Sequence, residues 1–212
     1  GVGQINRIFG IAREPIDIGP IANGLTVFIR IERIDRQIRS GQRGYGNVGI
    51  VIQAYLYRSV EDVQQLIRDC CSVRLCKGAY KEAATVAFPK KKDVDANYDK
   101  LTTILMDGAK QQGGPVASDD GRFPPMPGLA THDDQRVNFA KAYARKLELP
   151  QRSIEFQMLN GIRRDLQENL AKEGYPVRIY VPYGTEWYPY FMRRLAERPA
   201  NVWFLLSNFF RR

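Results

Sequence analysis

Short apolar runs alternate with longer amphipathic stretches along most of the chain. Each run is rich in β-branched residues and is followed by a polar or glycine-containing turn, which is the pattern of a buried strand. Six such runs occur, at residues 25–31, 48–55, 73–80, 129–132, 154–159 and 177–181. A helical pattern follows most of these turns, so the repeat predicts a parallel sheet covered by helices.

The spacing of the runs supports the same architecture. Most strand starts are about two dozen residues apart, which is the length of a strand, a helix and two loops. The interval between the third and fourth strands is longer, and it predicts a helix near 94–108 and a loop rich in glycine and proline over 111–128. For 212 residues, of which 44% are hydrophobic, we expect one domain over residues 1–212.

Polar residues recur within or at the ends of the predicted strands. In an α/β barrel the carboxyl ends of the strands build the active site, so polar side chains that converge there indicate a ligand. A Rossmann-like open sheet competes with the barrel, but no strand is followed by a Gly-x-Gly-x-x-Gly turn or a phosphate-binding loop. We therefore expect an α/β fold, an incomplete (β/α)8 TIM-type barrel with about six βα units. The polar residues are Gln53, Arg74, Lys77, Thr131, His132, Glu155, Gln157 and Tyr180.

The net charge favours an anionic partner. The chain has 32 basic and 23 acidic residues, a formal charge of +9, which suits nucleic acid, a membrane surface or an anionic cofactor. The charges are scattered, and the one basic triplet, at 90–92, stands beside Asp93 and Asp95. Because no continuous basic stripe with aromatic residues occurs, we expect no nucleic-acid binding.

A metal site is not expected either. Cys70, Cys71 and Cys76 lack metal-ligand spacing, and a single histidine cannot build a Cys/His zinc site. The N-terminus has no signal pattern and the apolar run at 203–206 is too short to span a bilayer, so a reducing, cytoplasmic location is expected. The tail at 203–212 either packs as a last helix or makes a peripheral contact with the inner membrane.

The segment 177–197 carries the clearest candidate for a ligand site. An apolar strand leads through a glycine turn into a helix with the adjacent residues Arg193 and Arg194. Two guanidinium groups can clamp a carboxylate, and Glu197 lies one helical turn beyond Arg193, where it can hold that side chain. Tyr190 lies on the same helical face. The alternative is a solvated basic helix end with an aromatic residue packed beneath it.

Six segments carry a family resemblance. In chain order they are Val-Gly-Ile-Val-Ile-Gln-Ala-Tyr-Leu-Tyr-Arg, Val-Arg-Leu-Cys-Lys-Gly-Ala-Tyr, Ala-Thr-His-Asp, Glu-Phe-Gln-Met-Leu-Asn-Gly-Ile-Arg-Arg-Asp-Leu-Gln, Val-Arg-Ile-Tyr-Val-Pro-Tyr-Gly and Trp-Tyr-Pro-Tyr-Phe-Met-Arg-Arg-Leu-Ala-Glu. They lie within residues 48–212. This part of the chain closely resembles the catalytic barrel of bacterial proline dehydrogenase, the flavoenzyme that oxidises L-proline to 1-pyrroline-5-carboxylate.

The resemblance implies an FAD site. It places Arg74, as the catalytic residue, close to the reactive edge of the isoalloxazine ring, where a cation stabilises the negative charge that arrives with a hydride. Lys77 before Gly78 would let the backbone approach a phosphate or ribose closely. The alternative is a set of satisfied core polar groups, with His132 as a helix cap. The residues implied to hold FAD are Gln53, Arg74, Lys77, Gly78, Ala79, Thr131 and His132.

The resemblance also implies a site for L-proline. Arg193 and Arg194 would clamp its carboxylate, which would fix the C5 hydrogen over the flavin N5, so much of the catalysis would be orientation. The implied electron acceptor is a membrane quinone. The residues implied to line the pyrrolidine ring are Tyr80, Tyr180, Tyr190 and Leu75.

The resemblance fails over residues 1–47. The two early strands of the family, one with a Lys-Leu-Ser/Thr motif whose lysine lies in the substrate site, have no counterpart here, and residues 27–35 lack the Asp-Met-Glu that ends the next strand. We expect a barrel truncated at its N-terminus, whose open strand edges favour self-association or pairing with a complementary segment. The alternative to an active enzyme is an inactive remnant that serves as a subunit or scaffold.

Overall fold

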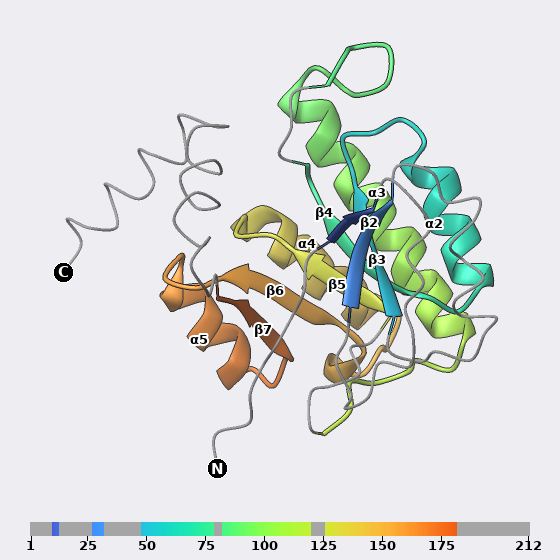
Figure 1. Cartoon of the computed structure of the whole chain (residues 1–212). Coiled ribbons are helices and arrows are strands. Elements are labelled where there is room, and N and C mark those ends of the chain that lie inside the picture. The colour runs from blue at the N-terminus through green and yellow to red at the C-terminus, as the bar shows by residue number, and fades with distance from the viewer. Residues whose placement is uncertain (1–9, 13–26, 32–47, 79–81, 120–125, 182–212) are drawn as a thin grey trace.

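The computed structural model describes residues 10–12, 27–31, 48–78, 82–119 and 126–181, and for residues 10–12, 27–31 and 48 it describes the backbone alone. The strands are β1 (Gly10–Ala12), β2 (Val27–Ile31), β3 (Val48–Gln53), β4 (Ser72–Cys76), β5 (Pro127–Ala130), β6 (Glu155–Leu159) and β7 (Val177–Tyr180) (Figure 1). The helices are α2 (Ser59–Arg68), α3 (Lys91–Gln111), α4 (Asp134–Lys146) and α5 (Arg164–Lys172), with a short 3-10 helix η2 (Gln151–Ser153).

All the described strands lie in one parallel sheet, in the order β1-β2-β3-β4-β5-β6-β7. Each strand pairs with the strand that follows it in the sequence, as in the wall of a barrel. A doubly wound sheet would instead reverse its strand order near the middle. The consecutive order therefore confirms the expected α/β class and favours the barrel over the Rossmann-like alternative.

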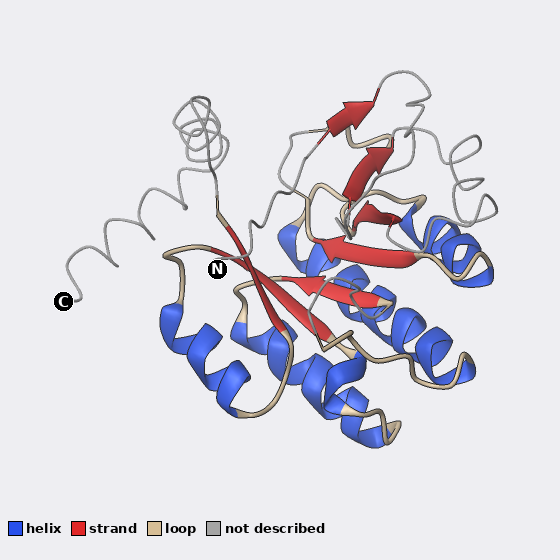
Figure 2. Ribbon diagram, turned by 60° about the horizontal axis from the view of Figure 1, so that its bottom comes forward, coloured by secondary structure: helices blue, strands red, loops and turns tan. Residues whose placement is uncertain are grey.

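The helices cover one face of this curved sheet, and we call the opposite face the inner face (Figure 2). Helix α2 packs on β3 and β4, α3 on β4 and β5, and α5 on β7. Successive side chains of a strand point to opposite faces, so each strand has one set of residues under the helices and one set on the inner face. None of the helices in the described ranges is long and apolar enough to cross a membrane.

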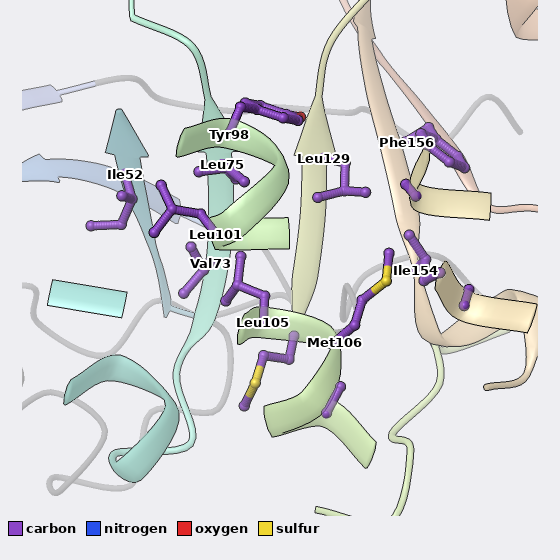
Figure 3. Packing of buried hydrophobic residues seen from close by; sticks show 14 of the residues in the cluster. Ile52, Val73, Leu75, Tyr98, Leu101, Leu105, Met106, Leu129, Ile154 and Phe156 are labelled. Atoms are coloured by element: carbon purple, nitrogen blue, oxygen red, sulfur yellow. The ribbon is translucent and has the colours of Figure 1, made fainter. Parts of the chain in front are cut away.

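The main hydrophobic core lies between the sheet and the helices. Val73 and Leu75 of β4 are fully buried against Leu101 and Leu105 of α3 (Figure 3). Helix α3 forms here because its apolar residues recur every three or four positions and give it one continuous apolar stripe. The buried residues of that stripe are Val94, Tyr98, Leu101, Leu105 and Ala109.

The sequence pattern located most of these elements. Each of the six predicted strands overlaps a strand of the sheet, and the helix expected near 94–108 is α3, with bounds Lys91–Gln111. The pattern did not predict β1, because three residues are too short to show an alternation. The expected third strand also ends earlier than its apolar run, at Cys76, since Gly78 follows with a left-handed φ of 106°.

Candidate functional site

The parallel order brings several polar residues to the same edge of the sheet. Gln53 is the last residue of β3, Lys77 follows β4, Thr131 and His132 follow β5, and Tyr180 ends β7. Because all these strands run in one direction, their carboxyl ends meet at one edge, where a barrel builds its active site. These five of the expected polar residues therefore lie at one edge, whereas Arg74 and Gln157 lie within their strands and Glu155 begins β6.

Arg74 lies on the inner face of the sheet. It stands between Val73 and Leu75, whose side chains are in the core under α3, so the alternation of the strand turns Arg74 the other way. Its guanidinium carbon is 4.2 Å from the centre of the Tyr180 ring, three strands away. A cation held over an aromatic ring at this distance is attracted by the ring electrons, and the attraction is larger in a buried site.

Leu75 lies on the other side of β4. Its side chain is fully buried in the hydrophobic core together with Leu101 of α3 (Figure 3). The resemblance implied that Leu75 lines the substrate ring, which requires a side chain on the inner face. The structure instead gives Leu75 a packing position beneath the helix layer.

Lys77 joins the strand edge to two helices. Its ammonium donates to Asp133, with 2.6 Å between Nζ and Oδ2, and also to Asp95 of α3. Asp133 is the N-cap of α4 and accepts from the backbone N–H of Gln135. Burial by itself would raise the pKa values of both carboxyls, but the contacts with Lys77, and for Asp95 also with Lys91, outweigh it and lower the pKa of each. The charge of Lys77 is therefore neutralised by carboxylates within the protein.

His132 is held as a neutral imidazole. Its Nε2 accepts a hydrogen bond from the backbone N–H of Leu159, at 3.0 Å. Burial, with the nearby charges of Arg163 and Arg74, lowers the pKa of His132 to about 4. With Nε2 acting as an acceptor, the ring proton lies on Nδ1, which is the one nitrogen that can donate to a ligand at neutral pH.

Gly78 brings the backbone against an aromatic ring. Its φ of 106° suits glycine, and a Cβ at this position would overlap the ring of Tyr55. Tyr55 is itself buried beside the end of β3. The chain just after β4 therefore stays close to the sheet only because residue 78 has no side chain.

Comparison with known proteins adds to this geometry. The family described as proline dehydrogenase matches residues 27–206. The chain belongs to the proline dehydrogenase family. It is 44% identical to proline dehydrogenase 1 of Bacillus subtilis strain 168 over 170 residues, which is 80% of this chain and 51% of that protein. It is 41% identical to proline dehydrogenase of Deinococcus radiodurans over 210 residues, 98% of this chain and 62% of that protein. The chain thus spans about half to three fifths of the length of these relatives.

Solved structures agree with the family assignment. Proline utilization A of Bdellovibrio bacteriovorus, inactivated by N-propargylglycine, matches with a TM-score of 0.64 and 28% identity over 81% of this chain and 20% of that chain. A second protein, described as bifunctional proline utilization A, matches with a TM-score of 0.58 and 24% identity over 76% of this chain and 18% of that chain. This second likeness concerns the fold alone. Together they confirm a TIM-type barrel fold for a member of the proline dehydrogenase family.

Some residues that the resemblance singled out lie outside the described ranges. These residues are Ala79, Tyr80, Tyr190, Arg193 and Arg194, and they include the whole carboxylate clamp. The predicted clamp therefore stays a prediction. Within the described ranges, no group of three or more His, Cys, Asp or Glu side chains could hold a metal ion.

Sequence reasoning missed Arg163, which ties two loops together at the site edge. Its guanidinium donates to Asp134, at 2.8 and 3.0 Å, to Asp165, and to the backbone oxygen of His132 at 3.4 Å. Hydrogen bonds to the two carboxylates raise the pKa of Arg163. The Arg-Arg-Asp sequence at 163–165 was a visible signal, but nothing local pointed to the loop after β5 as its partner.

Proposed function

We propose that the chain oxidises L-proline to 1-pyrroline-5-carboxylate, with FAD as the hydride acceptor. Membership of the proline dehydrogenase family supports the reaction class. The observation that carries the proposal to particular residues is Arg74, half-buried on the inner face of the sheet with its guanidinium over the Tyr180 ring. A fixed cation on the inner face of a barrel is suited to a reaction that places negative charge on a bound ring.

The residues at the strand ends fit a flavin in part. Gln53, 7% exposed, offers a buried amide, and His132 offers an Nδ1 donor at neutral pH. At Gly78 the space of the missing side chain is filled by the Tyr55 ring, so this glycine shapes the loop after β4 and gives no direct support for a cofactor. Lys77 fits less well as a phosphate ligand because Asp95 and Asp133 neutralise it. We therefore assign Lys77 to holding α3 and α4 at the site.

The side chains of this protein would provide orientation and charge. When bound, FAD supplies the two-electron acceptor, which no protein side chain can. Arg74 would stabilise the negative charge that reduction adds to the ring, and its position needs no rearrangement at the moment of reaction. Tyr180 would present an apolar ring face to the pyrrolidine while its hydroxyl is engaged elsewhere. Proline must bind with a neutral amine, because a protonated nitrogen opposes hydride loss from C5.

The proposed substrate site extends beyond the described residues. We keep Arg193 and Arg194 as the carboxylate clamp, with Tyr80 and Tyr190 at the ring and Ala79 at the flavin, on the resemblance alone. Leu75 is left out because it is buried in the core under α3. A membrane quinone as electron acceptor, a cytoplasmic location with peripheral membrane contact, and self-association are likewise proposals that rest on the sequence.

A flavin titration tests the proposal directly. The purified chain, saturated with FAD, should lose its visible flavin absorbance when L-proline is added without oxygen, and D-proline should be the weaker reductant. N-propargylglycine, which inactivates the Bdellovibrio relative, should abolish the bleaching. Arg74→Met should slow reduction by about two orders of magnitude, the usual effect of removing one electrostatic stabiliser.

A matched variant separates this role from general damage. Arg68 is an exposed arginine on α2, and Arg68→Met should bleach at the wild-type rate. Failure of the wild-type chain to bind FAD, or equal rates in the two arginine variants, would refute the assignment.

A further inference from the structure

A network of buried polar side chains lies on the inner face of the sheet and ends at Tyr180, the residue beneath Arg74. The Tyr180 hydroxyl donates to Gln157 Oε1 at 2.9 Å, and Gln157 Nε2 donates to Glu155 Oε1 at 2.7 Å. Glu155 also accepts from Nε of Arg178. All four of these side chains are buried, and Gln157 is only 1% exposed. Strands β6 and β7 thus contribute alternate residues, 155 and 157 on one and 178 and 180 on the other.

The neighbouring strand β5 leaves room for this network of side chains. Gly128 of β5 stands in register between Arg74 of β4 and Glu155 of β6. A Cβ at residue 128 would come within 2.6 Å of the Gln157 amide nitrogen, so any larger residue would displace that amide. The Gln157 side chain therefore occupies the space that a side chain at residue 128 would need.

The contacts allow one orientation of the Gln157 amide. Its nitrogen faces the Glu155 carboxylate and its oxygen faces the Tyr180 hydroxyl. The flipped amide would put an oxygen against the carboxylate, where two acceptors repel each other. Arg178 fixes Glu155, and Glu155 in turn fixes Gln157. The position of the Tyr180 hydroxyl therefore depends on the ion pair at the other end of this side-chain network.

Stability alone does not explain such an arrangement. Buried ion pairs of this kind are often no more stabilising than well-packed apolar residues of the same volume, because desolvation offsets the attraction. A fully satisfied polar network does hold side chains in one geometry. Here the side chain at its end is Tyr180, whose ring carries the Arg74 guanidinium at 4.2 Å.

We infer that Gln157 is a positioning residue that sets the Tyr180–Arg74 pair, with the Glu155–Arg178 ion pair as its anchor. This inference rests on the proposed function, since it concerns how Arg74 is presented to the flavin. Gln157 acts through Tyr180 and needs no contact with the cofactor. Removal of either partner of the Tyr180–Gln157 hydrogen bond should therefore give the same defect.

A double-mutant cycle on FAD binding tests the inference. Gln157→Met removes both hydrogen bonds at similar volume, and Tyr180→Phe removes the hydroxyl but keeps the ring under Arg74. Each should raise the Kd for FAD about three- to tenfold, which is the scale expected for one hydrogen bond. Each should also change the visible circular dichroism of the bound flavin. The double variant should be no worse than the single variants, because both act through one contact.

A buried amide elsewhere serves as the control. Asn97 of α3 also makes two hydrogen bonds, to Ala54 O and Ser59 Oγ, but it is not part of the side-chain network that ends at Tyr180. Asn97→Leu should lower the free energy of unfolding at least as much as Gln157→Met and leave the flavin dichroism unchanged. An equal spectral change in Asn97→Leu, or additive losses in the double variant, would overturn the inference while the proposed function stands. No FAD binding by the wild-type chain would overturn both.

Discussion

At the scale of single residues, the neutral state of His132 has a consequence for stability. Its pKa is lowered from 6.5 to about 4, mainly by burial. Between these pH values the unfolded chain binds a proton that the folded chain does not bind. The free energy of unfolding should therefore fall as the pH is lowered from about 6.5 to 4, by up to about 3 kcal/mol from this group.

One histidine makes this effect measurable. His132 is the only histidine in the chain, so His132→Gln removes every histidine contribution at once. The difference in unfolding free energy between wild type and His132→Gln should shrink by about 3 kcal/mol between pH 7 and pH 4. The carboxyl groups titrate in both proteins, so their contributions cancel in this difference. A difference that does not change with pH would show that the imidazole is protonated at its ordinary pKa in the folded protein.

Gly78 is a second residue whose local geometry allows a sharp test. Gly78→Ala suffers both the left-handed φ and the overlap with Tyr55. Gly113 also has a left-handed φ, of 83°, but nothing lies near its missing Cβ. Gly113→Ala should cost about 1 kcal/mol from the backbone alone, and Gly78→Ala about 2–4 kcal/mol more, measured by urea unfolding. Equal losses would mean that the Tyr55 ring moves aside freely.

At the scale of elements, Lys77 connects β4 to the start of α3 and to the N-cap of α4. The side chains of Lys77 and Asp95 are mostly buried, and that of Asp133 is 27% exposed. Asp95 and Asp133 have lowered pKa values, so this stabilisation is present above their unfolded pKa of 3.8 and is lost as the pH falls through their folded pKa values.

Lys77→Met tests this connection. It should lower the unfolding free energy at pH 7 by about 2 kcal/mol, between the values typical of exposed and buried pairs. The loss should shrink as the pH falls through the lowered pKa values of Asp95 and Asp133, because the protonated carboxyls no longer attract Lys77. Lys92 is an exposed residue at the start of α3, and Lys92→Met should have no comparable effect. A loss that persists unchanged in acid would assign Lys77 a packing role instead.

At the scale of the whole molecule, the order of the sheet decides which residues can meet. Arg74 and Tyr180 are far apart in the sequence and three strands apart in the sheet, yet they are in contact because the sheet curves toward its inner face. In a flat sheet, strands about 5 Å apart would separate these two side chains by roughly 15 Å. The single domain expected over residues 1–212 stays a prediction.

The sequence by itself determined the strands β2 to β7, the helix α3 and the parallel α/β class. These follow from local periodicity, since a period of two fixes opposite faces and apolar neighbours fix which face is buried. Only the tertiary structure decided that Lys77 is neutralised by Asp95 and Asp133, that Leu75 lies under α3, and that Gly128 makes room for Gln157. Those outcomes depend on strand register and on which loops are adjacent, and contacts between distant segments leave no periodic signal in the chain.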